Sequence, residues 1–141
     1  MARMIICVLL TMSFSLAHAD SIVGSWKFTS MIMEGQEVPP LNPDLILTFD
    51  FAEDGSDRLF WTRKGESGFC ERRARYDFDS NWLYEAIVWV NPDNAPECGK
   101  DPDMQLGRVT QTPARIKNGR FELDLNVGDS HLTYIFERAT P

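Results

Sequence analysis

The chain has 141 residues and a formal net charge of −7 at pH 7, with 14 Lys and Arg side chains against 21 Asp and Glu. This acidity disfavours nucleic acid and anionic membrane surfaces as partners, because both carry negative charge. The length suits one domain with one hydrophobic core.

The first 19 residues are typical of a secretory signal peptide. Arg3 supplies the positive start, residues 4–16 form an apolar run, and Ala17-His18-Ala19 is a small-x-small cleavage site. The run is shorter than the roughly 18–20 residues that cross a bilayer, so the sequence predicts no membrane span. We therefore expect cleavage after Ala19 and a periplasmic or secreted protein formed by residues 20–141.

Beyond the signal, apolar and polar residues alternate with a period of two, and turn residues recur about every ten positions, as in antiparallel barrels and sandwiches. The first strand is expected at residues 25–34, and the loop after it, 35–43, contains three prolines. A second strand is expected at 45–51. One face of the first strand carries Trp26, Phe28, Ser30 and Ile32, and the inward face of the second carries Leu45, Leu47, Phe49 and Phe51.

Three strands are expected next, at residues 57–64, 69–78 and 82–90. In the first, Leu59 and Trp61 compete with Phe60 for the interior. The strand at 82–90 is apolar on both faces, so its outer face is either covered or an exposed patch with a function. The strand at 69–78 places five residues on one face, namely Cys70, Arg72, Ala74, Tyr76 and Phe78.

Residues 91–103 contain three prolines and are predicted to form the longest loop. Strands are then expected at 104–112, at 120–127 after the turn Lys117-Asn118-Gly119, and at the end of the chain. Eight strands in meander order fit one closed, antiparallel up-and-down barrel, which leaves no sheet edge open. Inward positions include Met104, Leu106 and Arg108 on the first of these strands and Leu132, Tyr134 and Phe136 on the last.

The two ends of this predicted barrel resemble the lipocalin-like (calycin) β-barrels. Gly24-Ser25-Trp26 opens the first strand with the Gly-x-Trp pattern of that family, and Arg138 ends the last strand. In the family, the Trp plugs one end of the barrel and the Arg lies across its ring. A cation–π contact of about 0.5–2 kcal/mol favours such an arrangement. The resemblance implies an all-β, eight-stranded, lipocalin-like barrel in which Trp26 and Arg138 are structural.

Cys70 and Cys98 are the two cysteines that follow the predicted signal. Two cysteines in an exported chain usually form one disulfide. The bridge would close a loop of about 29 residues and contribute on the order of 3 kcal/mol. A redox pair is the alternative, but these two cysteines lack the Cys-x-x-Cys spacing.

Arg72 and Arg108 interrupt otherwise apolar inward faces. A charge inside a barrel needs a counter-charge, a hydrogen-bond network or a ligand anion, unless it lies at a strand end and reaches water. Arg and Tyr inside a small barrel are similar to the carboxylate clamp of the fatty-acid-binding proteins, which are calycins. The resemblance implies a site formed by Arg72, Tyr76, Arg108 and Tyr134 for a small hydrophobic or amphipathic ligand, with or without an anionic head.

The predicted interior is mostly aromatic and aliphatic, which suits a ligand-binding barrel and a barrel filled by its own side chains equally well. A cavity of about 300 Å³ or more would favour the ligand. A filled barrel would favour a protein–protein interaction module of the cell envelope or extracellular space. The expected lining of such a cavity is Phe49, Tyr76, Leu106 and Leu123.

Motifs for catalysis are absent from the sequence. His131 is the only histidine after the predicted signal, and there is no Gly-x-Ser-x-Gly and no phosphate-binding loop. Asp93, Glu97, Asp101 and Asp103 have a spacing that could serve Ca²⁺, but the ligand order of an EF-hand is missing. We therefore predict that the protein is not an enzyme and has no cofactor and no metal.

Overall fold

The computed structural model describes residues 21–139, so the predicted signal peptide lies outside the described residues. Within these residues, nine strands and two short 3₁₀ helices follow one another. They are β1 (Gly24–Met33), β2 (Gln36–Val38), β3 (Leu45–Phe51), β4 (Ser56–Arg63), β5 (Cys70–Phe78), β6 (Trp82–Val90), η1 (Pro96–Lys100), η2 (Pro102–Met104), β7 (Val109–Lys117), β8 (Arg120–Val127) and β9 (Ser130–Arg138).

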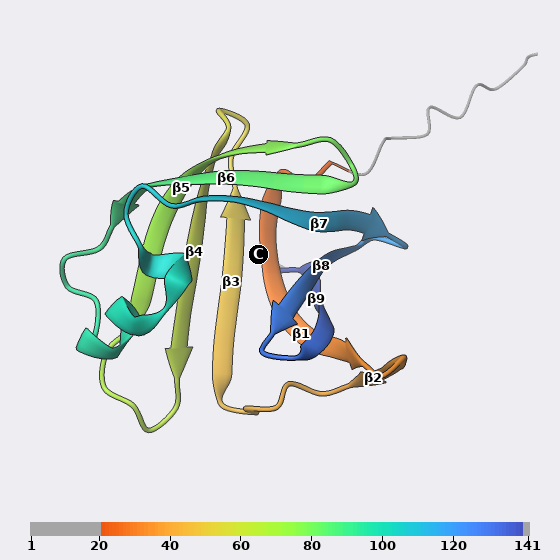
Figure 1. Ribbon diagram of the computed structural model, residues 1–141, viewed down its shortest axis with the longest axis horizontal. Helices are drawn as coiled ribbons and strands as arrows, with labels where there is room; N and C mark the ends of the chain where they lie inside the picture. The colour runs from red at the N-terminus through yellow and green to blue at the C-terminus, as the bar shows by residue number, and fades with distance from the viewer. Residues whose placement is uncertain (1–20, 140–141) are drawn as a thin grey trace, which may run out of the picture.

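Eight of the strands close into the predicted antiparallel barrel. The hydrogen-bonded order runs from β1 through β3 to β9, and β9 pairs back with β1. In Figure 1, β3 and β4 stand upright while β6 and β7 run across the view, so opposite walls of the barrel cross steeply. The ninth strand, β2, pairs with the end of β1 where the sequence predicts only a loop. Its three residues precede Pro39, so their amides remain free to join the ladder.

A β-bulge in β1 changes which of its residues face the interior. The register with β9 shifts between Phe28 and Ser30, so Thr29 is an extra residue. Phe28 and Met31 are consequently both buried, at 4% and 2% exposure. Ser30 and Ile32, predicted on the face of Trp26, lie instead on the opposite face.

The strand predicted at 104–112 is wrong in its bounds, because β7 begins only at Val109 and ends at Lys117. Met104 belongs to η2, whose first residue is Pro102, and Gly107 turns the chain with a φ of 82°. Proline at the start of a helix and glycine at positive φ both oppose an extended strand here. Arg108 is therefore exposed just before β7 and does not face the interior.

Aromatic side chains fill one end of the barrel around Trp26, which is fully buried. The indole N–H of Trp26 donates to the Ile22 carbonyl at 2.6 Å, and the Arg138 guanidinium lies 4.3 Å from the ring centroid. Arg138 also donates to the Val23 and Ser21 carbonyls at 2.8 and 2.6 Å. A Cβ at Gly24 would lie 2.6 Å from Arg138 Nη1, which explains the glycine. The surrounding rings are Phe49, Phe51, Phe121 and Phe136, with centroids 5.0 to 6.3 Å apart.

Candidate functional site

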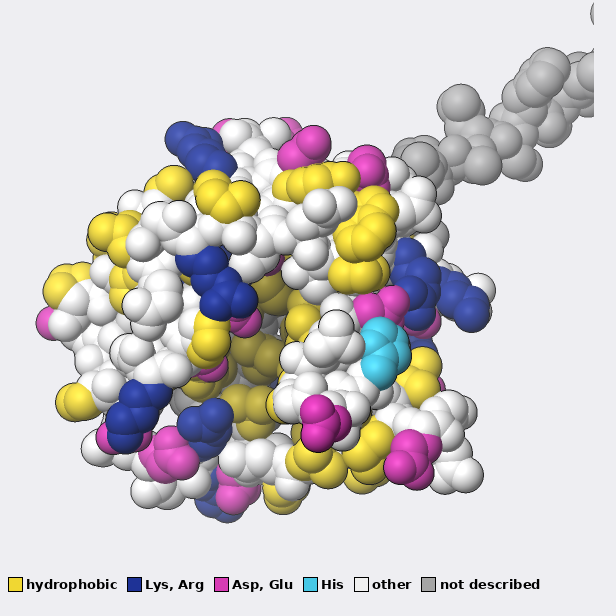
Figure 2. Space-filling model, in the orientation of Figure 1, with side chains coloured by type: hydrophobic (Ala, Val, Ile, Leu, Met, Phe, Trp, Pro, Cys, Tyr) yellow, Lys and Arg dark blue, Asp and Glu magenta, His cyan; other side chains and the backbone are white. Residues whose placement is uncertain are grey.

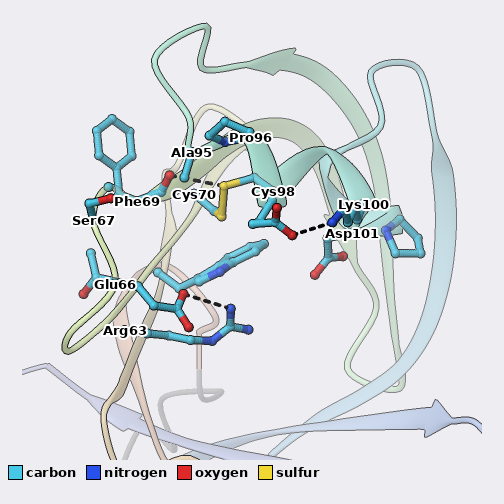
Figure 3. Close-up of a pocket in the computed structure, with 15 residues that line it drawn as sticks. Arg63, Glu66, Ser67, Phe69, Cys70, Ala95, Pro96, Cys98, Lys100 and Asp101 are labelled. Carbon is cyan, nitrogen blue, oxygen red and sulfur yellow. Dashed lines mark hydrogen bonds and ion pairs between the residues drawn. A yellow bond between two sulfur atoms is a disulfide. The ribbon is translucent and has the colours of Figure 1, made fainter.

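A cavity of about 660 Å³ opens at the other end of the barrel, which we call the mouth. One wall is formed by the end of β4, the turn after it and the start of β5, and the other by η1 and the residues around it. Figure 3 shows side chains of the two walls facing one another across this space. The lining includes Trp61, whose ring belongs to the core cluster.

A disulfide between Cys70 and Cys98 joins the two walls and confirms the predicted bridge. Cys70 begins β5 and Cys98 lies in η1, and both are buried, at 7% and 3% exposure. Ala95 N–H donates to the Phe69 carbonyl at 3.0 Å, directly beside the bridge. The covalent bond and this hydrogen bond hold η1 against the start of β5, and so they fix the distance between the two walls of the cavity where the bridge lies.

The interior near the mouth is incompletely filled. Leu45, Leu47, Leu125 and Tyr134 pack against the core cluster, yet each is only half-buried. Tyr134 stacks on Phe28 with 4.5 Å between ring centroids. Burial raises the pKa of the Tyr134 hydroxyl, and the negative charge of Asp101 adds to this. Figure 2 shows a depression in the middle of the visible face with hydrophobic side chains at its floor.

Arg72 lies one inward position below Cys70 on β5, and two carboxylates neutralise it. Its Nη1 donates to Asp57 at 2.5 Å and its Nη2 to Glu85 at 2.6 Å. The three side chains are 3%, 0% and 8% exposed, and the guanidinium lies 5.5 Å from the Phe49 ring centroid. Among the described residues, Arg72 Nε and Asp57 Oδ2 have no hydrogen-bond partner. Of the ways in which a barrel can hold an internal arginine, this one uses counter-charges, those of Asp57 and Glu85.

The four residues predicted for one ligand site occupy four separate places. Arg72 is paired inside the barrel, and Arg108 is exposed outside it. Tyr76 lies near the filled end, where its hydroxyl donates to the Ala52 carbonyl at 2.8 Å. Tyr134 stacks on Phe28 inside the barrel and is not among the residues that line the cavity.

Sequence reasoning missed Asp57 and Glu85, although the alternation contains a signal for both. Asp57 has the same parity as the inward-facing Leu59 and Trp61, and Glu85 has the same parity as Leu83 and Ile87. A carboxylate in phase with apolar residues on each of two strands, opposite an inward arginine, predicts an internal ion pair. The pattern is easily overlooked when Asp57 is taken as the first residue of the strand, because a polar residue is common at a strand end and does not then suggest a buried position.

The Asp57 carboxyl is expected to make the fold less stable as the pH rises. Burial, followed by the negative charge of Glu85, raises the pKa of Asp57 to about 7, against the opposing charge of Arg72. The folded protein thus holds a proton that the unfolded chain has already lost above its own pKa near 4. The free energy of unfolding should fall by about 1–3 kcal/mol between pH 5 and pH 8 in urea titrations. Asp57→Asn should flatten this slope, and an unchanged slope would contradict the assignment.

Two of the acidic residues in the loop between β6 and β7 have partners within that loop. Glu97 pairs with Lys100 at 2.7 Å, and Asp101 accepts the Asp103 amide at 2.8 Å at the start of η2. Among residues 21–139, no group of three or more His, Cys, Asp or Glu side chains is placed to hold a metal ion. Within the same range, no helix is both long and apolar enough to cross a bilayer.

Comparison with known proteins supports the architecture. No protein-family model and no curated protein sequence matches the chain. Among solved structures, a lipocalin-like protein from Bacteroides uniformis ATCC 8492 matches with a TM-score of 0.54 and 14% identity, over 85% of this chain and 99% of that one. A variant of the fluorescent protein UnaG matches with a TM-score of 0.44 and 12% identity, over 85% and 97%. The closed eight-stranded barrel and the first of these matches show that the chain has a lipocalin-like fold.

Proposed function

We propose that the protein binds a small apolar or amphipathic molecule in the mouth of the barrel. The observation that carries this proposal is the cavity of about 660 Å³. Clefts of roughly 300–1,000 Å³ are the usual size for small-molecule sites. The half-buried Leu45 and Leu47 pair in the β3–β4 register with the lining residues Arg63 and Trp61, so they offer apolar surface next to the cavity. The lining differs from the predicted one, because Phe49 and Leu123 are buried in the core and Leu106 is exposed.

The charges around the cavity favour an uncharged head group over a carboxylate. Arg63 pairs with Glu66 at 3.6 Å and Lys100 with Glu97 at 2.7 Å, so both cations of the lining already have partners. Arg72 is neutralised below them. Asp101 adds a negative charge to the lining. A ligand anion would therefore meet carboxylates and no unpaired arginine, which makes the fatty-acid clamp the weaker version of the proposal.

Calorimetric titration with saturated alcohols and fatty acids of matched chain length tests the proposal. Affinity should rise with chain length, by about 0.8 kcal/mol for each CH₂ buried, until the cavity is full. The alcohol should bind at least as tightly as the acid. The absence of binding by either series would contradict the ligand site, and a preference for the acid that disappears in Arg108→Leu would restore the clamp.

A matched pair of variants locates the binding. Ser67 lines the cavity, and Ser67→Phe should fill part of it and weaken binding about tenfold, or about 1.4 kcal/mol. Glu53→Phe adds the same ring at an exposed turn near the filled end and should leave the affinity unchanged. Equal losses in both variants would place the ligand elsewhere.

We also infer that the protein functions outside the reducing cytosol. The apolar run and cleavage site at residues 1–19 support export, and so does the buried disulfide, since such bonds persist in oxidising compartments. Mass determination of the protein recovered after expression in its own host tests this, with a chain beginning at Asp20 as the expected result.

A further inference from the structure

The outer surface of β5, β6 and β7 carries a group of side chains that the barrel interior does not use. We define the Arg–Trp face as Arg73, Arg75, Val88, Trp89, Arg108 and Val109. Strand pairing makes it continuous, because Arg73 is opposite Trp89, Arg75 is opposite Ala86, and Ala86 is opposite Val109. The Arg108 carbonyl accepts the Ile87 amide at 2.9 Å, which places Arg108 beside Val88.

Apolar side chains of this face are open to solvent. Val88 is 53% exposed, Trp89 37% and Val109 76%. A bulge between the β5 and β6 registers leaves Val88 without a partner in β5 and turns it outward. β5 and β6 each pair with a strand on either side. The exposed groups are therefore side chains, and no unpaired backbone edge is open here. Contiguous exposed apolar groups with a polar rim mark interaction sites.

The three arginines of the face have no carboxylate at ion-pair distance among residues 21–139. In the same range, Arg58, Arg63, Arg72, Arg115 and Arg120 are all paired. The Arg73 guanidinium lies 5.3 Å from the Trp89 ring centroid. Of the carboxylates on the outer side of β5, Glu71 is held by Arg58, and Asp77 lies beyond Arg75. Arg75 donates to the Asp54 carbonyl at 3.4 Å, and the Asp54, Glu71 and Asp103 carboxylates lie close enough to interact with the charges of these arginines. The face thus presents three guanidinium groups that no ion pair neutralises, in a chain whose net charge is −7.

We propose that the Arg–Trp face docks the protein on a bilayer surface that contains anionic phospholipid. Tryptophan settles at the level of the lipid head groups, and arginines beside it are attracted to their phosphates. The exposed Val88 and Val109 add apolar surface beside these arginines, which can enter the head-group region. Net charge alone predicts repulsion, but salt screens charges more than about 8 Å away, so the face in contact decides. This docking goes beyond the proposed ligand site and does not depend on it.

Co-sedimentation with vesicles tests the docking. The full chain should bind vesicles of phosphatidylcholine with phosphatidylglycerol at a ratio of about seven to three, and bind pure phosphatidylcholine weakly. Arg73→Gln with Arg75→Gln should weaken binding to the anionic vesicles about 30-fold. Val109→Asp should also weaken it. The emission of Trp89 should shift to the blue on the anionic vesicles, and Trp89→Phe should remove this shift.

Matched control variants distinguish binding through the Arg–Trp face from binding through total charge. They also distinguish it from binding through the N-terminal residues, which all variants share. Lys27→Gln with Lys117→Gln removes the same charge from two exposed lysines elsewhere and should leave vesicle binding unchanged. Leu41→Asp, at a residue 71% exposed, is the control for Val109→Asp. No binding, binding that the arginine pair does not weaken, or equal losses in the lysine pair would each overturn the proposal. Binding to a soluble acidic protein without vesicle binding would overturn it as well.

Discussion

Trp26→Ala is expected to lower the free energy of unfolding by about 3–5 kcal/mol, because truncating a fully buried indole leaves a cavity between packed rings. The change also removes the hydrogen bond to Ile22 and the ring under Arg138. Urea unfolding followed by circular dichroism measures the effect without using tryptophan emission.

Two comparisons identify the cause of that loss. Arg138→Ala should cost less than Trp26→Ala, since it removes one cation–π contact and two hydrogen bonds to carbonyls near the surface. Trp82→Ala, at a residue 38% exposed on β6, should cost less than about 1 kcal/mol. If Trp26→Ala unfolded at the same urea concentration as the unmodified protein, the filled end would not depend on Trp26.

Arg72→Met should cost about 3–5 kcal/mol at pH 8, because it leaves the Asp57 and Glu85 carboxylates buried without their cation. The loss should shrink at pH 5, since the raised pKa of Asp57 allows one of the two carboxyls to be neutral there. Urea titrations at both pH values measure the difference.

Arg58→Met is the matched control for this change. Arg58 also contacts two carboxylates, those of Asp50 and Glu71, but its side chain is 35% exposed on the outer surface. Its loss should cost less than about 1 kcal/mol, as for exposed ion pairs. Replacing the whole internal group with Arg72→Met, Asp57→Val and Glu85→Met should recover most of the stability. Equal costs for Arg58→Met and Arg72→Met would mean that burial does not set the energy.

The strands that sequence reasoning predicts best are those with an uninterrupted alternation. The bounds predicted for β3 and β6 agree with the structure, because turn residues flank both segments and apolar residues fill their inward positions. The bulges at Thr29 and Val88 cannot be predicted from the sequence, because a residue is extra only in comparison with the strand that pairs with it. One such bulge was enough to reverse the faces predicted for Ser30 and Ile32.

The candidate site was harder to predict than the fold. The alternation of β5 alone predicts that Arg72 points inward, but its partners come from β4 and β6, and the register with those strands cannot be read from β5. The inward position predicted for Arg108 is wrong because Met104 and Leu106 have the alternation of a strand within a segment that the disulfide and Pro102 hold as 3₁₀ turns. The cavity lies against that segment, so its lining depended on the least regular part of the chain.

The pairing of β1 with β9 also has a kinetic consequence. Arg138 and Val23 are separated by 115 positions in the chain, so their contact closes nearly the whole polypeptide into a ring. Loop-closure entropy opposes such a contact until intervening hairpins have formed, and this slows the folding of β topologies. We therefore expect the contact between Trp26 and Arg138 to form late in folding, after the local hairpins. Interactions made that late chiefly slow unfolding. Substitutions of Trp26 or Arg138 are therefore expected to speed unfolding and to change the rate of folding little.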